Sequence, residues 1–341
     1  MKKSVKLIMF AAIFAVGIGE AVSAKTDEVT LIFAAYTVPK EVYQREIIPA
    51  FQKYWKEKTG QAVKFDESYE ASGAQSRAIA AGLEADIAAL SLEKDINRLK
   101  DAGLITHDWK DNNYKGFVTN SLTVIAYRPG NPKDIKGWED LARQNVDVIY
   151  PSPKTSGGAM WAINAIYGAG LKMSEIKTGK KDYASARQLL KSIQKRVKVM
   201  DKSGRLAVTT FENGIGDVLV TYEDEALLRQ KQGKEFPFLT PESTILIENP
   251  IALIDKNVDK HQTRKVAEAF VEFAHSKEAQ RLFAQYGLRP VNEEVAREFA
   301  AKYPAPKYLF NINYLGGWNQ VENEIYGKNG VWTKIIEESE R

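Results

Sequence analysis

The stretch VDVIYPSPKTSGGAMWAINAIYG, residues 146–168, contains a strand, a loop and a helix start in direct succession. Four of its first five residues are apolar and predict a buried strand, while apolar residues at helical spacing in its second half predict a helix. Ser156 lies at the expected N-cap and is followed by Gly157 and Gly158. The first N–H groups of a helix have no partner of their own and lie at the positive end of its dipole. The stretch therefore predicts either an ordinary serine cap or a site where an anion contacts the backbone.

A second stretch, DESYEASGAQSRA at residues 66–78, has the same order of features. Strand residues are followed by Ser72 and Gly73, which open a predicted helix. Two serine–glycine helix starts, each directly after a strand, favour a shared anion site over two coincidental caps. Neither loop has the glycine and lysine pattern of a P-loop, and neither is GxGxxG. We therefore predict a small anion as the ligand.

The pattern along the chain predicts an α/β protein. Apolar or alternating runs that read as strands alternate with helical patterns in the first third of the chain, and this order predicts a parallel sheet with helices on its faces. The same alternation begins again at residue 146. Two α/β sheets joined by extended segments predict two lobes with a ligand cleft between them. The first predicted strands and helices cover residues 29–36, 41–60, 61–68, 72–83 and 85–92.

The first 24 residues predict a secretory signal peptide. A basic start precedes the apolar run LIMFAAIFAVGIG, and small residues end the segment at Ala24. The alternative is an uncleaved membrane anchor, which we disfavour because only residues 6–20 are available for a span. The chain has no cysteine, so disulfides and thiolate nucleophiles are excluded, and we do not expect a lipid-anchored amino terminus. The protein is expected to be exported to the periplasm.

Composition argues against several classes of partner. The formal net charge is +4, and removal of the signal peptide takes away three lysines and one glutamate, which leaves +2. Lysine and arginine are scattered along the chain, so we expect no nucleic-acid partner. No spacing of potential ligands predicts a metal site and no motif predicts a cofactor. The carboxylate run at residues 223–225 is expected to be solvated.

Several longer segments resemble the periplasmic sulfate-binding proteins that serve ABC importers, over nearly all of the chain after residue 24. The most specific are PKTSGGAMW at 153–161 and GIGDVLVTYEDEA at 214–226, and four others occur in the expected order. The resemblance implies a two-lobed, type II solute-binding fold with sulfate or thiosulfate in the cleft. It also implies a partnership with the membrane subunits of an importer, and we expect the binding protein to be a monomer.

The resemblance places the ligand-binding residues of the family on seven positions of this chain: Ser72, Ser156, Gly157, Gly158, Gly204, Tyr222 and Thr37. The serines are expected to donate hydroxyl hydrogens, the glycines backbone N–H groups, and Tyr222 its phenol where the family has an indole. Each hydrogen bond to a charged group contributes about 1.5–3 kcal/mol, so six or seven neutral donors suffice for micromolar binding of a dianion. Thr37 replaces an aspartate of the family, and Lys154 is expected to be solvated.

One departure from the family leaves an alternative ligand open. Glu70 lies two residues before Ser72, where a carboxylate beside a dianion is unfavourable. Sulfate is fully ionised and offers only acceptors, whereas phosphate or a phosphonate retains a proton that Glu70 could accept. Molybdate is a further alternative oxyanion. We favour sulfate with Glu70 facing solvent.

A serine hydrolase acting through Ser156 is the remote alternative, and we expect no enzymatic activity and no catalytic residue. A serine nucleophile needs a base, and the chain has only His107, His261 and His275, which we expect at the surface. It also lacks the G-x-S-x-G elbow.

We expect the chain to divide into four parts. Residues 1–24 form the signal peptide, 25–122 the first part of lobe I, and 123–244 lobe II. Residues 245–341 are expected to return to lobe I and to end in a wrapping tail. The aromatic side chains of this tail predict packing onto a lobe in preference to a carbohydrate platform.

Overall fold

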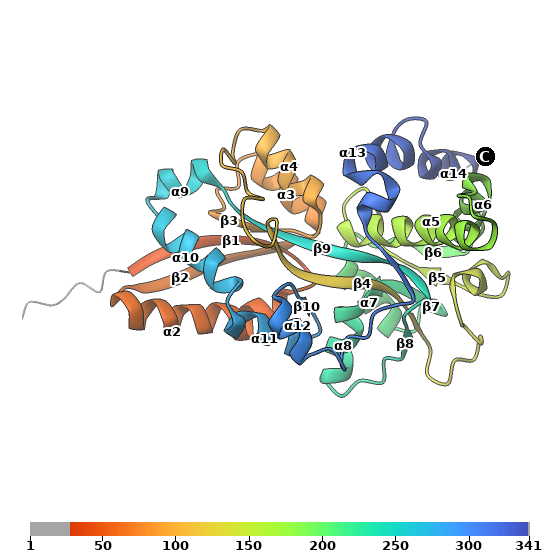
Figure 1. The fold of residues 1–341 in the computed structure, drawn as a ribbon, viewed down its shortest axis with the longest axis horizontal. Coiled ribbons are helices and arrows are strands. Elements are labelled where there is room, and N and C mark those ends of the chain that lie inside the picture. The colour runs from red at the N-terminus through yellow and green to blue at the C-terminus, as the bar shows by residue number, and fades with distance from the viewer. Residues whose placement is uncertain (1–27, 340–341) are drawn as a thin grey trace, which may run out of the picture.

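The computed structural model describes residues 28–339, and the signal-peptide prediction lies outside these residues. Eleven strands within this range form one mixed sheet whose main path is β2-β1-β3-β9-β4-β7-β5-β6. Helices cover both faces of each half of the sheet (Figure 1). We call the half around β1, β2 and β3 lobe I and the half around β5, β6 and β7 lobe II. The expected α/β fold with two lobes is therefore confirmed, although one continuous sheet replaces the two separate sheets that we expected.

Lobe I is built on the parallel strands β1 (Glu28–Tyr36), β2 (Ala62–Glu70) and β3 (Ile87–Ala89). The apolar run in β1 is buried, with Leu31 and Phe33 fully inaccessible. The long first helix ends at Gly60, which has the left-handed backbone (φ 76°) that favours glycine. The other elements of lobe I are α1 (Lys40–Val42), the π-helical η1 (Tyr43–Ile47), α2 (Ile48–Thr59), α3 (Ser72–Ala80), α4 (Glu93–Asp101), α9 (Asp255–His261), α10 (Arg264–Ala274), α11 (Lys277–Gln285), β10 (Arg289–Pro290) and α12 (Glu293–Glu298).

Lobe II is built on the parallel strands β5 (Val148–Ile149), β6 (Val197–Val199) and β7 (Val218–Tyr222). The 22-residue helix α5 (Gly157–Thr178) buries Trp161, Ile163 and Ile166 in the largest apolar cluster of the protein. The remaining elements of lobe II are η2 (Trp138–Ala142), α6 (Tyr183–Gln194), α7 (Gly204–Glu212), α8 (Glu223–Lys231) and β8 (Phe238–Leu239).

Two long antiparallel strands, β4 (Phe117–Tyr127) and β9 (Ser243–Leu253), run through both lobes. The first half of β4 pairs with β10 of lobe I, and its second half pairs with β7 of lobe II. In the same way, β9 pairs with β3 at one end and with β11 (Tyr308–Phe310) at the other. Relative motion of the lobes must therefore bend these two strands.

The C-terminal segment packs on lobe II beside α5 and α6 (Figure 1). The indole ring of its Trp318 packs edge-to-face against that of Trp161, with the ring centroids 5.0 Å apart. Phe310 of the same segment is only 5% exposed. This segment consists of β11, η3 (Ile312–Leu315), α13 (Gly317–Val321), the π-helical η4 (Glu322–Tyr326) and α14 (Val331–Ser339). Its aromatic side chains therefore contribute to the core of lobe II.

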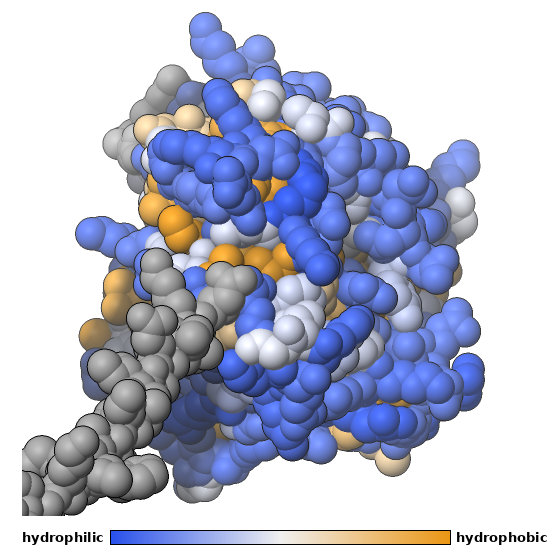
Figure 2. Space-filling model, turned by 90° about the vertical axis from the view of Figure 1, so that its left-hand side faces the viewer, coloured by the Kyte–Doolittle hydropathy of each residue, from blue (hydrophilic) through white to orange (hydrophobic). Residues whose placement is uncertain are grey.

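Hydrophilic side chains cover most of the end of lobe I (Figure 2). The apolar residues of this lobe lie instead in two buried clusters, one on each face of its sheet. No helix among residues 28–339 is long and apolar enough to cross a membrane.

Candidate functional site

The two predicted serine–glycine helix starts meet at the interface between the lobes. Helix α3 begins at Ser72 and α5 begins at Gly157, with Ser156 as its N-cap. The amide of Gly73 donates a 3.1 Å hydrogen bond to the carbonyl of Thr155, which joins lobe I to lobe II at this point. The structure is therefore closed, with the positive ends of two helices brought together from opposite lobes.

Ser156 is buried at 4% exposure and has an extended backbone (φ −102°, ψ 126°). In the ordinary serine cap, the hydroxyl oxygen would accept a hydrogen bond from an amide in the first turn of the same helix. No such side-chain cap is present in α5. The first turn of α5 therefore keeps its N–H groups for another acceptor, which is the arrangement that suits an anion.

Ser72 occupies a different position from the one expected for a ligand-binding hydroxyl. Its hydroxyl donates to Asp95 at 2.6 Å and accepts the amide of Ser91 at 3.0 Å. Asp95 in turn accepts a hydrogen bond from Arg98 at 2.9 Å. The Ser72 hydroxyl is thus engaged inside lobe I, and the amide of the neighbouring Gly73 is the group at the start of α3 that reaches lobe II.

Tyr222 is buried beside two of the predicted glycines. It ends β7, serves as the N-cap residue of α8 and is only 2% exposed. A Cβ atom added to Gly158 would lie 2.7 Å from its ring, and one added to Gly204 would lie 3.5 Å away. Its ring also lies 6.1 Å from the ring of Tyr36. Two of the predicted glycines are therefore contact surfaces for this phenol ring.

The remaining predicted positions lie at the edge of this cluster. Thr37 directly follows β1 and is half-buried, and its neighbour Val38 lies 3.4 Å from the Cβ position of Gly204. Glu70 is the last residue of β2 and is exposed, as is Lys154. The expectation that these two charged side chains face solvent is confirmed.

Ser91 was not singled out from the sequence, although it contacts three site residues. It follows β3 and is fully buried. Its hydroxyl lies 2.6 Å from the hydroxyl of Tyr222, and the indole N–H of Trp161 donates to its carbonyl at 3.0 Å and to its hydroxyl at 3.1 Å. A Cβ atom on Gly157 would lie 2.6 Å from the same hydroxyl. The only sequence signal was its place after a strand in ADIAALSL.

The carboxylates of residues 223–225 are buried, so the expectation that they are solvated was wrong. Glu223 accepts two hydrogen bonds from Arg289, at 2.6 and 2.9 Å. Asp224 accepts one from Ser121 at 2.6 Å, and burial raises the pKa of Asp224 to about 7 despite this bond. Each carboxylate is buried because tertiary structure supplies its own partner, which a local sequence pattern does not reveal.

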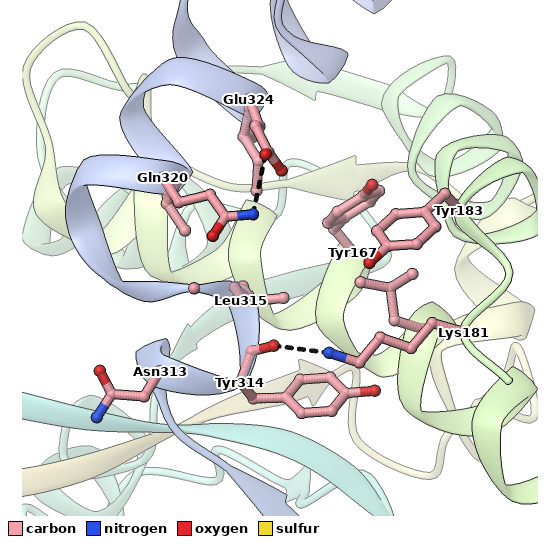
Figure 3. Close-up of a pocket in the computed structure, with 12 residues that line it drawn as sticks. Tyr167, Lys181, Tyr183, Asn313, Tyr314, Leu315, Gln320 and Glu324 are labelled. Carbon is pink, nitrogen blue, oxygen red and sulfur yellow. Dashed lines mark hydrogen bonds between the residues drawn. The ribbon is translucent and has the colours of Figure 1, made fainter. Parts of the chain in front are cut away.

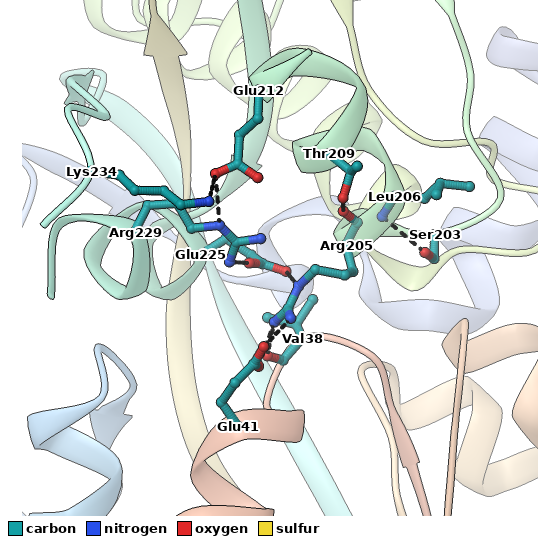
Figure 4. Close-up of polar contacts among 10 residues, drawn as sticks. All are labelled: Val38, Glu41, Ser203, Arg205, Leu206, Thr209, Glu212, Glu225, Arg229 and Lys234. Atoms are coloured by element: carbon teal, nitrogen blue, oxygen red, sulfur yellow. Dashed lines mark hydrogen bonds and ion pairs between the residues drawn. The ribbon is translucent and has the colours of Figure 1, made fainter. Parts of the chain in front are cut away.

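Arg205, in the first turn of α7, connects the lobes through its guanidinium group (Figure 4). It forms a bidentate ion pair with Glu41 of α1 and donates to the carbonyl of Val38 at 2.9 Å. Within lobe II it also donates to Glu225 at 2.9 Å. Burial opposes the ionisation of Glu41, but the hydrogen bond and the positive charge of Arg205, with smaller contributions from the backbone and Arg229, together hold the pKa of Glu41 below its ordinary value.

The histidines are all bonded within lobe I or its crossing strand. His107 pairs with Asp255, and His261 pairs with Asp86. The two ring nitrogens of His275 bond backbone carbonyls of Val271 and Phe117. His275 is half-buried, so it is less exposed than the surface position that we expected. Among residues 28–339, no group of three or more acidic or histidine side chains is arranged to hold a metal ion.

A pocket of about 250 Å³ lies outside the lobe interface, between α5, α6 and the C-terminal segment (Figure 3). Lys181 donates to the carbonyl of Tyr314 at 3.0 Å and its ammonium lies 3.9 Å from the centre of that ring. On the opposite wall, Gln320 donates to Glu324 at 2.9 Å. The contacts of Lys181 attach the C-terminal segment to lobe II, whereas the bond between Gln320 and Glu324 lies within that segment.

Comparison with known proteins agrees with this architecture. Residues 31–289 match the family model described as bacterial extracellular solute-binding protein. The chain is 41% identical to a sulfate-binding protein of Synechococcus elongatus, over 92% of this chain and 87% of that protein. It is 34% identical to a thiosulfate-binding protein of Pseudomonas aeruginosa, over 97% of this chain and 98% of that protein.

A solved structure has a comparable sequence identity to this chain. The sulfate-binding protein SubI from Mycobacterium tuberculosis is 36% identical and superposes with a TM-score of 0.80, covering 87% of this chain and 99% of that chain. The fold and the site thus define an extracellular solute-binding protein of bacteria. Within that class, the chain belongs to the family of sulfate- and thiosulfate-binding proteins.

Proposed function

We propose that this protein binds sulfate, or the closely related thiosulfate, between its two lobes and delivers it to an ABC importer. The observation that carries the proposal is the meeting of two helix N-termini, α3 and α5, neither of which has a side-chain cap. Such N-termini present unpaired N–H groups and a positive dipole end to an anion. The relatives that align over most of the chain are described as sulfate- or thiosulfate-binding proteins, which supports this ligand class.

The donors in this proposal are neutral. Ser156 supplies its hydroxyl, Tyr222 its phenol, and the amides at the starts of α3, α5 and α7 supply backbone N–H groups. These amides belong to Ser72, Gly157, Gly158 and Gly204, with that of Thr37 at the end of β1. The neighbouring cation Arg205 is already paired with carboxylates, so dipoles rather than a countercharge stabilise the dianion.

The protein acts outside the cytoplasm as a monomer in this proposal. Residues 1–24 direct export and are removed, and closure of the lobes creates the form that the importer subunits recognise. The proposal includes no enzymatic step. A serine nucleophile needs a base within hydrogen-bond reach, and the three histidines are bonded to other partners in or near lobe I.

Glu70 offers no support for phosphate as the preferred ligand. Its side chain is exposed at the end of β2, so it is not placed to accept a proton from a bound anion. A site made of donors alone favours the fully ionised ligand.

Titration calorimetry of the mature protein with sulfate, thiosulfate, molybdate and phosphate tests the proposal. We expect the tightest binding for sulfate or thiosulfate, with an affinity that is constant from pH 5 to 8. Absence of binding by both anions, or a preference for phosphate that increases as the solution becomes more acidic, would contradict it.

A further inference from the structure

Three side chains form a continuous hydrogen-bonded chain across the closed lobe interface. The indole of Trp161, in α5, donates to the Ser91 hydroxyl at 3.1 Å, and the Ser91 hydroxyl lies 2.6 Å from that of Tyr222. Trp161 and Tyr222 belong to lobe II, whereas Ser91 follows β3 in lobe I. The three side chains are 1%, 0% and 2% exposed. The chain of bonds is therefore complete only when the lobes are closed, and bulk water does not compete with it.

The direction of this chain follows from the number of hydrogens available. An indole N–H can only donate, so the Ser91 oxygen accepts from Trp161. Ser91 and Tyr222 together have two hydroxyl hydrogens, and the bond between them uses one. The other hydroxyl hydrogen is free to be donated to a third group. The phenol is the more acidic hydroxyl and therefore the stronger donor to an anion. The favourable order in the presence of an anion is Trp161 to Ser91, Ser91 to Tyr222, and Tyr222 to the ligand, because each donated bond strengthens the next.

The phenol is placed to use that remaining hydrogen at the start of α5. Its oxygen lies 3.3 Å from the Cβ position of Gly158, over the first turn of the helix. Burial raises the pKa of the Tyr222 phenol far above its ordinary value, so the hydroxyl retains its proton throughout the working pH range. Ser91 itself lies against Gly157, on the same helix turn.

We propose that Ser91 is a positioning residue that turns the phenol of Tyr222 into a fixed donor toward the bound anion when the lobes close. The inference rests on the proposed function, because it assumes an oxyanion at the start of α5. Ser91 thereby makes the site selective: a phenol that already accepts from Ser91 is less available to accept a proton from a protonated ligand. The site then favours sulfate over hydrogen phosphate.

A double-mutant cycle in the mature protein tests this role. We expect Tyr222→Phe to weaken sulfate binding about tenfold or more, because it removes one hydrogen bond to a charged ligand. Ser91→Ala is expected to weaken it about three- to tenfold in the wild-type background and to have little further effect in the Tyr222→Phe background. Ser91→Ala should also reduce the ratio of sulfate to phosphate affinity at pH 6, which a loss of packing alone would not do.

Ser243→Ala is the matched control, since it removes a buried serine hydroxyl that has no hydrogen-bond partner among residues 28–339. It should leave both affinities unchanged. Equal effects of Ser91→Ala in the two backgrounds, or an unchanged affinity ratio, would overturn the role of Ser91. Failure of the wild-type protein to bind sulfate or thiosulfate would instead overturn the proposed function, so the two failures are distinguishable.

Discussion

Arg205 of lobe II holds both carboxylate oxygens of Glu41 of lobe I, so one guanidinium group joins the two lobes directly. The two side chains of this ion pair are about one fifth exposed, Arg205 at 22% and Glu41 at 20%. The pair can form only in the closed protein. It should therefore contribute to closure, and through closure to ligand affinity, without contributing to the folding of either lobe.

Glu41→Gln should accordingly weaken sulfate binding with little change in the stability of the ligand-free protein. Loss of the charged partner should cost the closed form about 1–2 kcal/mol, which corresponds to roughly 5- to 30-fold in affinity. Calorimetry measures the affinity, and small-angle scattering measures the fraction closed. The control is Glu338→Gln, which breaks the 2.6 Å pair with Arg187 inside lobe II and should leave affinity unchanged. An unaltered affinity for Glu41→Gln would show that the pair does not influence closure.

The two glycines at the start of α5 should respond differently to substitution by alanine. In Gly157→Ala the new methyl group would meet Ser91 of lobe I, whereas in Gly158→Ala it would meet Tyr222, which belongs to lobe II like Gly158 itself. Gly157→Ala should thus prevent full closure and weaken sulfate binding by about 1–3 kcal/mol, while the melting temperature of the free protein is unchanged. Gly158→Ala should lower that melting temperature as well.

Gly137→Ala serves as the control for both variants, because its methyl group would meet only the end of the Glu139 side chain at 3.4 Å. Identical effects of Gly157→Ala and Gly158→Ala on the free protein would contradict the assignment of the two contacts to different lobes.

Alanine substitutions of Ser72 and Ser156 should have different effects, although both serines lie at a helix start that follows a strand. Ser156→Ala removes a hydroxyl that does not cap its own helix, so it should weaken sulfate binding by about 1–3 kcal/mol and leave stability unchanged. Ser72→Ala deprives the buried Asp95 of a donor and should lower the free energy of unfolding by about 1–3 kcal/mol. Urea unfolding and calorimetry on both variants provide the comparison. Wild-type stability for Ser72→Ala would show that its bond to Asp95 is not important for the fold.

Local sequence signals were sufficient to locate the framework of the site. The helix starts at Ser72 and Gly157 could be predicted because each follows a predicted strand and lies among small and hydroxyl residues. The resemblance to a family added Gly204, Tyr222 and Thr37. The structure places Gly158 and Gly204 against the ring of Tyr222, and Ser91 connects this phenol to Gly157 and Ser72.

The partners of these residues could not be predicted in the same way. Ser91 and Tyr222 are 131 positions apart, and Arg205 and Glu41 are 164 positions apart. Serine, arginine and glutamate are common surface residues, so their pairing becomes evident only from tertiary structure. The same reason explains why residues 223–225 were expected in solvent. The role of Ser72 changed because Asp95, from the next helix, lies within reach of its hydroxyl.

Asp224 is expected to make the protein less stable as the pH rises, which is the opposite of the usual effect of a carboxylate. Its folded-state pKa of about 7 lies above the ordinary value of 3.8, mainly because of burial. The stability from this group is therefore complete below about pH 4 and is lost as the pH rises through 7. Asp224→Asn stays neutral at every pH. We therefore expect the free energy of unfolding of this variant, relative to that of wild type, to rise by about 2–3 kcal/mol when the pH is raised from 5 to 8. Urea unfolding at both pH values measures this change, and the exposed Asp66→Asn is the control. Parallel stability curves for Asp224→Asn and wild type would mean that Ser121 and the start of α8 keep the carboxylate ionised in the folded protein.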